Sequence, residues 1–182
     1  MLRVDPVNLE HAGVCRTAFP GAPEACGRVL LVGELNPISS QPDDALYCEP
    51  AGCSGHRLQD FVLALPRLHY LAMWRTNLCR GEWRIGPARE RAAELVRPES
   101  PWRTIVMLGR RVAGAFGEAK LAPFTAVGGP DRTATLVSIP HPSGLCRAWN
   151  DPLAARRARD LLAKLEPGVP WGAEGDGREA GA

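Results

Sequence analysis

The sequence has no apolar run of about 18 residues, and no basic start leads into an apolar signal segment. It gives no sign of a transmembrane helix or a secretory signal, so we expect a cytoplasmic protein with no membrane partner. Disulfide bonds are not needed for stability, because 182 residues, 45% of them apolar, can bury a full core in one domain. No internal repeat is visible.

Closely spaced cysteine pairs are also missing. The chain has six cysteines, but no CxxC pair, and four residues separate Cys48 from Cys53, a loose spacing for zinc. We therefore expect ordinary reduced thiols and no metal site.

Lysine is scarce. Lys120 and Lys164 are the only lysines among 22 basic residues, so the other 20 are arginines. A guanidinium binds phosphate bidentately, and this bias suits contact with nucleic acid. A genomic preference for Arg, Ala, Gly and Pro codons explains the same bias, and composition alone does not separate the two explanations.

Four short apolar runs predict buried strands, over residues 28–32, 73–78, 103–108 and 134–139. Helical patterns lie between and after these runs, over residues 55–65, 86–96, 109–119 and 151–165. The alternation predicts an α/β fold: a single three-layer α/β/α domain with a central, mainly parallel four-stranded sheet.

The ends of this domain can be placed from the sequence. The last helix is expected to have Asp151 as its cap and Pro152 at its first position. The domain is expected to span residues 1–165. Residues 166–182 are rich in Gly, Pro and acidic residues, and we expect them to form a disordered tail.

Three polar segments follow predicted strands: GELNP (33–37), Asn77, and HPSGL (141–145). The carboxyl ends of parallel strands meet at one edge of a sheet, where ligands bind, so these segments are expected to converge. A proline on each side of His141 fixes the backbone and holds the imidazole at the mouth of a strand.

These segments resemble, in their order and spacing, the uracil-DNA glycosylase superfamily. Its members have a water-activating loop after the first strand, a base-reading Asn ending the second and a His-Pro-Ser loop after the fourth. VGELNP, RTNL and PHPSGL stand at these places, and TIVMLGRRVAGAFG is similar to the third strand and next helix of bacterial members. The similarity spans about residues 29–165.

The resemblance implies a uracil-DNA glycosylase-like fold and an enzyme. Such an enzyme hydrolyses the N-glycosidic bond of a flipped uracil, or of another damaged or modified base, in single- or double-stranded DNA, which initiates base excision. It is expected to act as a monomer, with DNA as its partner and without a cofactor.

Two residues are assigned to base recognition and catalysis by this resemblance. Asn77 would pair with O4 and N3–H of uracil, because an amide presents a donor and an acceptor together. His141 would donate a hydrogen bond to O2 as negative charge gathers there. A strand-ending role for Asn77 and an ordinary loop role for His141 remain open.

The loop after His141 is assigned to DNA binding. Leu145 matches the apolar wedge that fills the gap left by the flipped base, and Arg147 is placed to reach a phosphate. Ser143 and Gly144 belong to the same loop. An ordinary packing role for Leu145 remains open.

The water-holding residue has two candidates. Anchored on Gly33, Glu34 matches a family form with a catalytic Glu; anchored on Pro37, Asn36 matches a form in which Asn positions water. A carboxylate can act as a base or stabilise the cationic sugar, whereas Asn only orients water. We favour Asn36, with Glu34 as the alternative; a strand-ending turn explains Asn-Pro as well.

Two further residues are expected to shape the base pocket. Ile38 follows the loop proline, and its bulk would discriminate against thymine if it faces the pocket. Tyr47 is expected to stack on the flipped base when Ala51-Gly52 is aligned with the bacterial segment. Another alignment places Pro50 there instead.

The iron–sulfur members of the superfamily differ from this chain. Their four cysteines include a close N-terminal pair and one cysteine four residues after the Asn. Here Cys15 and Cys26 are far apart, Cys79 follows Asn77 by two residues, and the region of the last ligand has no cysteine. We therefore do not expect such a cluster.

Two other functions remain open. The first is a glycosylase of the same fold specific for hypoxanthine, an oxidised or alkylated base, or a hypermodified phage base. The second is a nucleic-acid or nucleotide-binding module that has lost catalysis.

Overall fold

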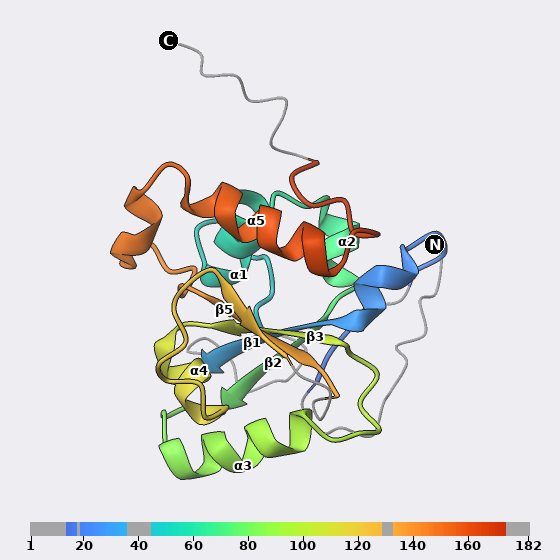
Figure 1. The fold of residues 1–182 in the computed structure, drawn as a ribbon. Coiled ribbons are helices and arrows are strands. Elements are labelled where there is room, and N and C mark those ends of the chain that lie inside the picture. Colours follow the sequence, from blue (N-terminus) through green and yellow to red (C-terminus); the bar gives the residue numbers. More distant parts are fainter. Residues whose placement is uncertain (1–13, 18, 36–44, 129–132, 174–182) are drawn as a thin grey trace.

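The computed structural model describes residues 14–17, 19–35, 45–128 and 133–173 of the chain (Figure 1). Its centre is one sheet with the strand order β2–β1–β3–β5–β4. The strands are β1 (Val29–Leu35), β2 (Trp74–Cys79), β3 (Thr104–Leu108), β4 (Thr125–Val127) and β5 (Thr135–Ile139). The first four strands of this order run parallel, and β4 pairs with β5 in the antiparallel sense.

The α/β class and the mainly parallel sheet are confirmed, but the sheet has five strands, not the four that the sequence predicts. The additional strand, β4, has three residues and lies at the edge of the sheet. Three residues are too few to show the alternation by which a strand is recognised in a sequence.

Helices cover both faces of the sheet (Figure 1). One face carries α1 (Ser54–His56), the π-helix η3 (Arg57–Val62), α2 (Arg67–Leu71) and α5 (Ala154–Leu165). The other face carries α3 (Ile85–Leu95) and α4 (Arg110–Ala115). Two short 3-10 helices, η1 (Glu24–Arg28) and η4 (Arg147–Asn150), precede β1 and α5.

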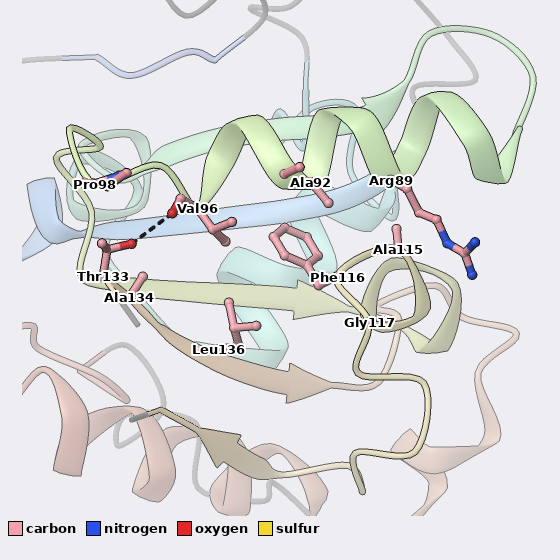
Figure 2. A pocket seen from close by; sticks show the side chains of 11 residues that line it. Arg89, Ala92, Val96, Pro98, Ala115, Phe116, Gly117, Thr133, Ala134 and Leu136 are labelled. Atoms are coloured by element: carbon pink, nitrogen blue, oxygen red, sulfur yellow. Dashed lines mark hydrogen bonds between the residues drawn. The ribbon is translucent and has the colours of Figure 1, made fainter. Parts of the chain in front are cut away.

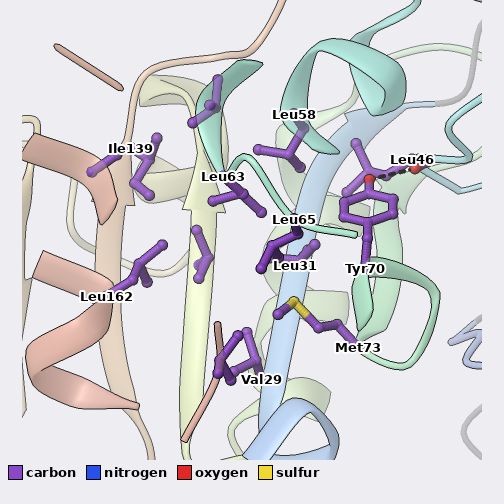
Figure 3. Packing of buried hydrophobic residues seen from close by; sticks show 14 of the residues in the cluster. Val29, Leu31, Leu46, Leu58, Leu63, Leu65, Tyr70, Met73, Ile139 and Leu162 are labelled. Atoms are coloured by element: carbon purple, nitrogen blue, oxygen red, sulfur yellow. Dashed lines mark hydrogen bonds between the residues drawn. The ribbon is translucent and has the colours of Figure 1, made fainter. Parts of the chain in front are cut away.

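The two helical layers explain why the strands are continuously apolar. Val29 and Leu31 of β1 face the cluster below α5 and η3, whereas Leu30 and Val32 face α3 and α4. Side chains alternate along a strand, so a strand covered on both faces needs apolar residues at every position. Figure 3 shows the first cluster, where the Tyr70 hydroxyl donates to the Leu46 carbonyl at 2.6 Å.

The start of α5 differs from the expectation. The helix begins at Ala154, so Pro152 lies ahead of its first residue. The Asp151 carboxylate accepts the N–H of Leu153 at 2.9 Å, which stabilises the turn before the helix and does not cap the helix itself.

The packed structure also continues past the end of α5, where a tail was expected. The Glu166 carboxylate is buried, accepts the Thr104 hydroxyl at 2.8 Å and lies 3.4 Å from Arg28 Nε. Val169 is buried in the core. Residues 166–173 therefore belong to the folded domain, and residues 174–182 lie outside the described residues.

None of the helices in the described part of the chain has the length and apolar character needed to cross a membrane.

Candidate functional site

The carboxyl edge of the sheet brings together residues from four strands. Glu34 and Asn77 lie near the ends of β1 and β2, Gly109 follows β3, and His141 follows β5 after Pro140. Gly33 pairs with Asn77 in the parallel register. The expected convergence of the polar segments on one edge is therefore seen for Glu34, Asn77 and His141. Asn36 and Ile38 lie outside the described residues.

Glu34 and His141 both lie next to Gly109. This glycine has φ +101° and ψ 162°, a conformation that only glycine adopts readily. A Cβ on Gly109 would lie 3.2 Å from the His141 Cβ and 3.7 Å from Glu34 Oε1. The missing side chain lets the carboxylate and the histidine approach each other.

The other oxygen of Glu34 contacts a guanidinium that the sequence reasoning did not single out. Arg111 Nη1, in the first turn of α4, lies 3.4 Å from Glu34 Oε2. The sequence could have indicated this residue, because Gly109 and Arg111 come directly after β3. Ligands bind at the carboxyl ends of parallel strands, and β3 is one of these strands.

Three hydrogen bonds hold His141 and Pro142 in place. The Ser143 N–H donates to His141 Nδ1 at 3.2 Å, and Trp149 Nε1 donates to the His141 carbonyl at 2.7 Å. Arg57 Nε, on η3, donates to the Pro142 carbonyl at 2.9 Å. These contacts, together with the flanking prolines, hold the imidazole in one orientation, and they identify Arg57 and Trp149 as supports that the sequence did not reveal.

The hydrogen bond at Nδ1 decides the tautomer of His141. Because Nδ1 accepts a backbone N–H, the proton of the neutral ring resides on Nε2. Burial lowers the pKa of His141 below its ordinary value of 6.5, and the negative charge of Glu34 opposes this only in part. At neutral pH the ring is uncharged and can donate one hydrogen bond from Nε2.

Asn77 lies over Gly33 on the neighbouring strand. A Cβ on Gly33 would overlap Asn77 Oδ1 and lie 3.1 Å from Leu46 Cδ2. Asn77 Oδ1 is buried and has no hydrogen-bond partner among the described residues. A buried amide oxygen without a partner is unfavourable unless a donor is supplied by water, by another group of the protein or by a ligand.

Tyr47 follows Leu46, whose side chain packs near Gly33. Tyr47 is half-buried, its hydroxyl accepts Arg67 Nη2 at 3.1 Å, and the Arg67 guanidinium lies over its ring at 5.9 Å. A Cβ on Gly55 would overlap the Tyr47 carbonyl, so close backbone packing holds this segment. Pro50, the alternative stacking residue, is exposed.

The end of the His141 loop projects into solvent. Leu145 is 95% exposed, so the packing role left open for it is absent from this fold. Gly144 and Arg147 are also exposed, and Ser143 is half-buried through its contact with the imidazole. An exposed leucine at the tip of a rigid loop is free to insert into a partner.

A cavity of about 600 Å³ lies elsewhere, between α3, the end of α4 and the start of β5 (Figure 2). Its walls are mostly apolar, with Arg89 at one end and Thr133 at the other. The Thr133 hydroxyl donates to the Val96 carbonyl at 3.0 Å. Among the described residues, none of the predicted site residues lines this cavity, and Arg89 is the only titratable group of its lining.

The thiols and carboxylates do not form a metal centre in the described segments. All six cysteines are free. Within those segments, no group of three His, Cys, Asp or Glu side chains is placed to hold a metal ion.

Comparison of the chain with models of protein families gives no match, and no curated protein matches it. The functional conclusion therefore depends on the geometry of the carboxyl edge.

Proposed function

We propose that the protein is a DNA N-glycosylase with a uracil-DNA glycosylase-like fold, which hydrolyses the N-glycosidic bond of an extruded uracil or related base. One arrangement carries the proposal. A neutral histidine that presents Nε2–H and a carboxylate both lie next to Gly109, on the same sheet edge as a buried amide oxygen without a partner among the described residues. Groups of these three kinds can stabilise a departing base, act on water and read the base.

The spacing of the strands supports a base between Asn77 and His141. The strands β2 and β5 are separated by β1 and β3, which places their backbones about 14 Å apart at the usual interstrand distance. This span accommodates two facing side chains with a planar base between them. The base would present O4 and N3–H to Asn77 and O2 to His141.

The reaction can be written in terms of these side chains. The bond between C1′ and N1 breaks, and its electron pair moves into the base, where charge gathers on O2. His141 Nε2–H stabilises that charge as a preorganised donor. A water oxygen then bonds to C1′, and the water's proton passes to the Glu34 carboxylate, whose charge also stabilises the cationic sugar.

The position of Glu34 beside His141 supports this carboxylate as the group that acts on water. The sequence favours Asn36 for that task, and Asn36 remains the alternative. Comparison of Glu34→Gln with Asn36→Ala separates them, because the residue that holds the water gives the larger loss of excision rate.

DNA would be bound by the loop after His141. The exposed Leu145 would fill the gap left by the extruded nucleotide, and Arg147 would contact a phosphate of the same strand. Neither side chain is needed to stabilise the fold, so replacing them tests DNA binding separately from folding.

The experiment that tests the proposal is excision from an oligonucleotide that carries a single uracil, single- or double-stranded. We expect release of uracil by the wild-type protein and a loss of about 100- to 1000-fold in His141→Ala, the effect of removing one preorganised donor. His69→Ala, a histidine on α2, is the matched control and should retain the rate. Equal rates in wild type and His141→Ala would contradict the proposal.

A panel of strands with hypoxanthine, oxidised and alkylated bases then defines the substrate. Release of one of these in place of uracil, with the same dependence on His141, would assign the same chemistry to a different base. Tight binding without release of any base would indicate a binding module and contradict the enzymatic proposal.

A further inference from the structure

Arg111 is the one charged side chain of α4 that the structure pairs with the candidate site. Its side chain is 64% exposed, and Nη1 lies 3.4 Å from Glu34 Oε2, whereas the Glu34 side chain is 21% exposed. The pair therefore lies where the solvent meets the sheet edge, with the carboxylate on the inner side.

The two oxygens of Glu34 point to different neighbours. Oε2 faces Arg111, whereas Oε1 lies close to the empty space above Gly109 that the His141 Cβ also borders. A carboxylate on a flexible side chain would otherwise turn outward to be fully hydrated, because a half-buried charge loses hydration. The ion pair with Arg111 opposes that rotation.

We propose that Arg111 is a positioning residue that holds the Glu34 carboxylate next to Gly109, near His141. This inference rests on the proposed function, because Glu34 is there the group that acts on water. Arg111 itself touches neither the base nor the water. It acts through Glu34, and its loss would let the carboxylate leave the imidazole.

The pKa of His141 reports the position of the carboxylate without any substrate. Among the described residues, Glu34 from β1 acts on the charge of His141, Arg111 from α4 contacts Glu34, and Arg57 from η3 binds the Pro142 carbonyl. Arg147 lies in the same loop and is exposed. Glu34 raises the pKa of His141, so loss of this carboxylate lowers that pKa. Removal of a nearby cation alone would have the opposite effect and raise it.

This difference in sign makes the test decisive. NMR titration follows His141 among the four histidines of the chain, assigned with His141→Gln. We expect Glu34→Gln to lower the pKa of His141, Arg111→Ala to lower it by less, because the loss of the cation itself acts in the opposite direction, and Arg111→Lys to restore it in part. Arg110→Ala, which removes the adjacent exposed arginine of α4, should leave it unchanged. An unchanged or raised pKa in Arg111→Ala would overturn the inference.

Excision kinetics provide the second measurement. Arg111→Ala should lower the single-turnover rate by about 5- to 100-fold. The lower bound corresponds to the free energy of a surface ion pair, and the upper bound to the rate lost when a catalytic group is misplaced. In the Glu34→Gln background the same substitution should have no further effect, and a full additional loss would overturn the inference. If no base is excised while the His141 titration follows the expected pattern, the proposed function fails and the positioning role of Arg111 stands.

Discussion

The Asn77 carboxamide oxygen occupies the space above Gly33, its partner in the β1–β2 register, so that a side-chain atom at residue 33 would overlap it. The absence of a side chain at Gly33 thus leaves the space in which the Asn77 amide lies. This pair links the geometry of the sheet to the proposed recognition of a base, because Asn77 Oδ1 is a buried acceptor that lacks a partner among the described residues.

Gly33→Ala should displace the Asn77 amide. The added methyl group would overlap Oδ1 and press against Leu46, so we expect a loss of about 1–3 kcal/mol in the free energy of unfolding, as for other overpacked sites. Affinity for a uracil-containing strand should fall together with stability. Denaturant titration measures the first effect and fluorescence anisotropy the second.

Gly86→Ala is the matched control for this substitution. Gly86 lies in α3, and nothing lies within 4 Å of the added Cβ. Alanine is the better helix former by up to about 1 kcal/mol, so this variant should be as stable as the wild type or more so. Equal stability of Gly33→Ala and Gly86→Ala would show that the Asn77 amide is not held against β1.

Gly109→Ala should separate the two partners that meet over this residue. The backbone conformation alone opposes a side chain by about 1–3 kcal/mol, and the new methyl group would lie 3.2 Å from the His141 Cβ. We expect both a loss of stability and a lower excision rate. Gly117→Ala has a positive φ of 82° but nothing within 4 Å, so it should lose stability and keep its rate. Similar rates in both variants would contradict the contact.

Trp149→Phe removes the indole N–H that binds the His141 carbonyl while keeping an aromatic ring between Phe61 and Phe124. A carbonyl left without its donor reduces stability by about 1–3 kcal/mol. The excision rate should also fall, because the backbone of His141 loses the hydrogen bond that holds it.

Trp171→Phe provides the comparison for this prediction, because Trp171 Nε1 donates to the Glu166 carbonyl at 2.9 Å, after α5. Both variants lose one hydrogen bond of the same kind. Thermal unfolding should show a loss of stability in both variants, whereas only Trp149→Phe should change the excision rate. A rate loss of the same size in Trp171→Phe would mean that general destabilisation explains the effect.

The stability of the protein should depend on pH through His141. Burial holds the folded-state pKa of this ring below its ordinary value of 6.5, so the folded state favours the neutral ring. The stabilising contribution is fully present above pH 6.5 and is lost as the pH falls through the folded-state pKa. Denaturant unfolding over this range should show a steeper decline in wild type than in His141→Gln. A parallel decline in both proteins would contradict the burial argument.

Much of the fold follows from the sequence, because a parallel sheet covered on both faces requires continuous apolar strands. The same topology predicts that residues after different strands meet at one edge, as Glu34, Asn77 and His141 do. The strand β4 escaped prediction because its three residues show no period. The packing of residues 166–173 escaped because Glu166 is buried through partners, Thr104 and Arg28, that lie far away in the chain.

The candidate site was predictable only in part for a related reason. Chain order identifies which residues reach the edge, but not which side chains touch there. The contacts of Glu34 with Arg111, and of Gly109 with His141, join residues from separate strands and helices. Such contacts depend on where α4 begins and on the backbone conformation of Gly109. Neither can be predicted from the presence of a glycine in the sequence.

The most direct test of the convergence on one base is a crystal structure of the protein with DNA that carries a non-hydrolysable uracil nucleotide. We predict that the base is extruded, with the Asn77 amide and His141 Nε2 both within about 2.7–3.2 Å of its polar atoms. A base that remains stacked in the duplex, or one bound away from Asn77 and His141, would contradict this prediction.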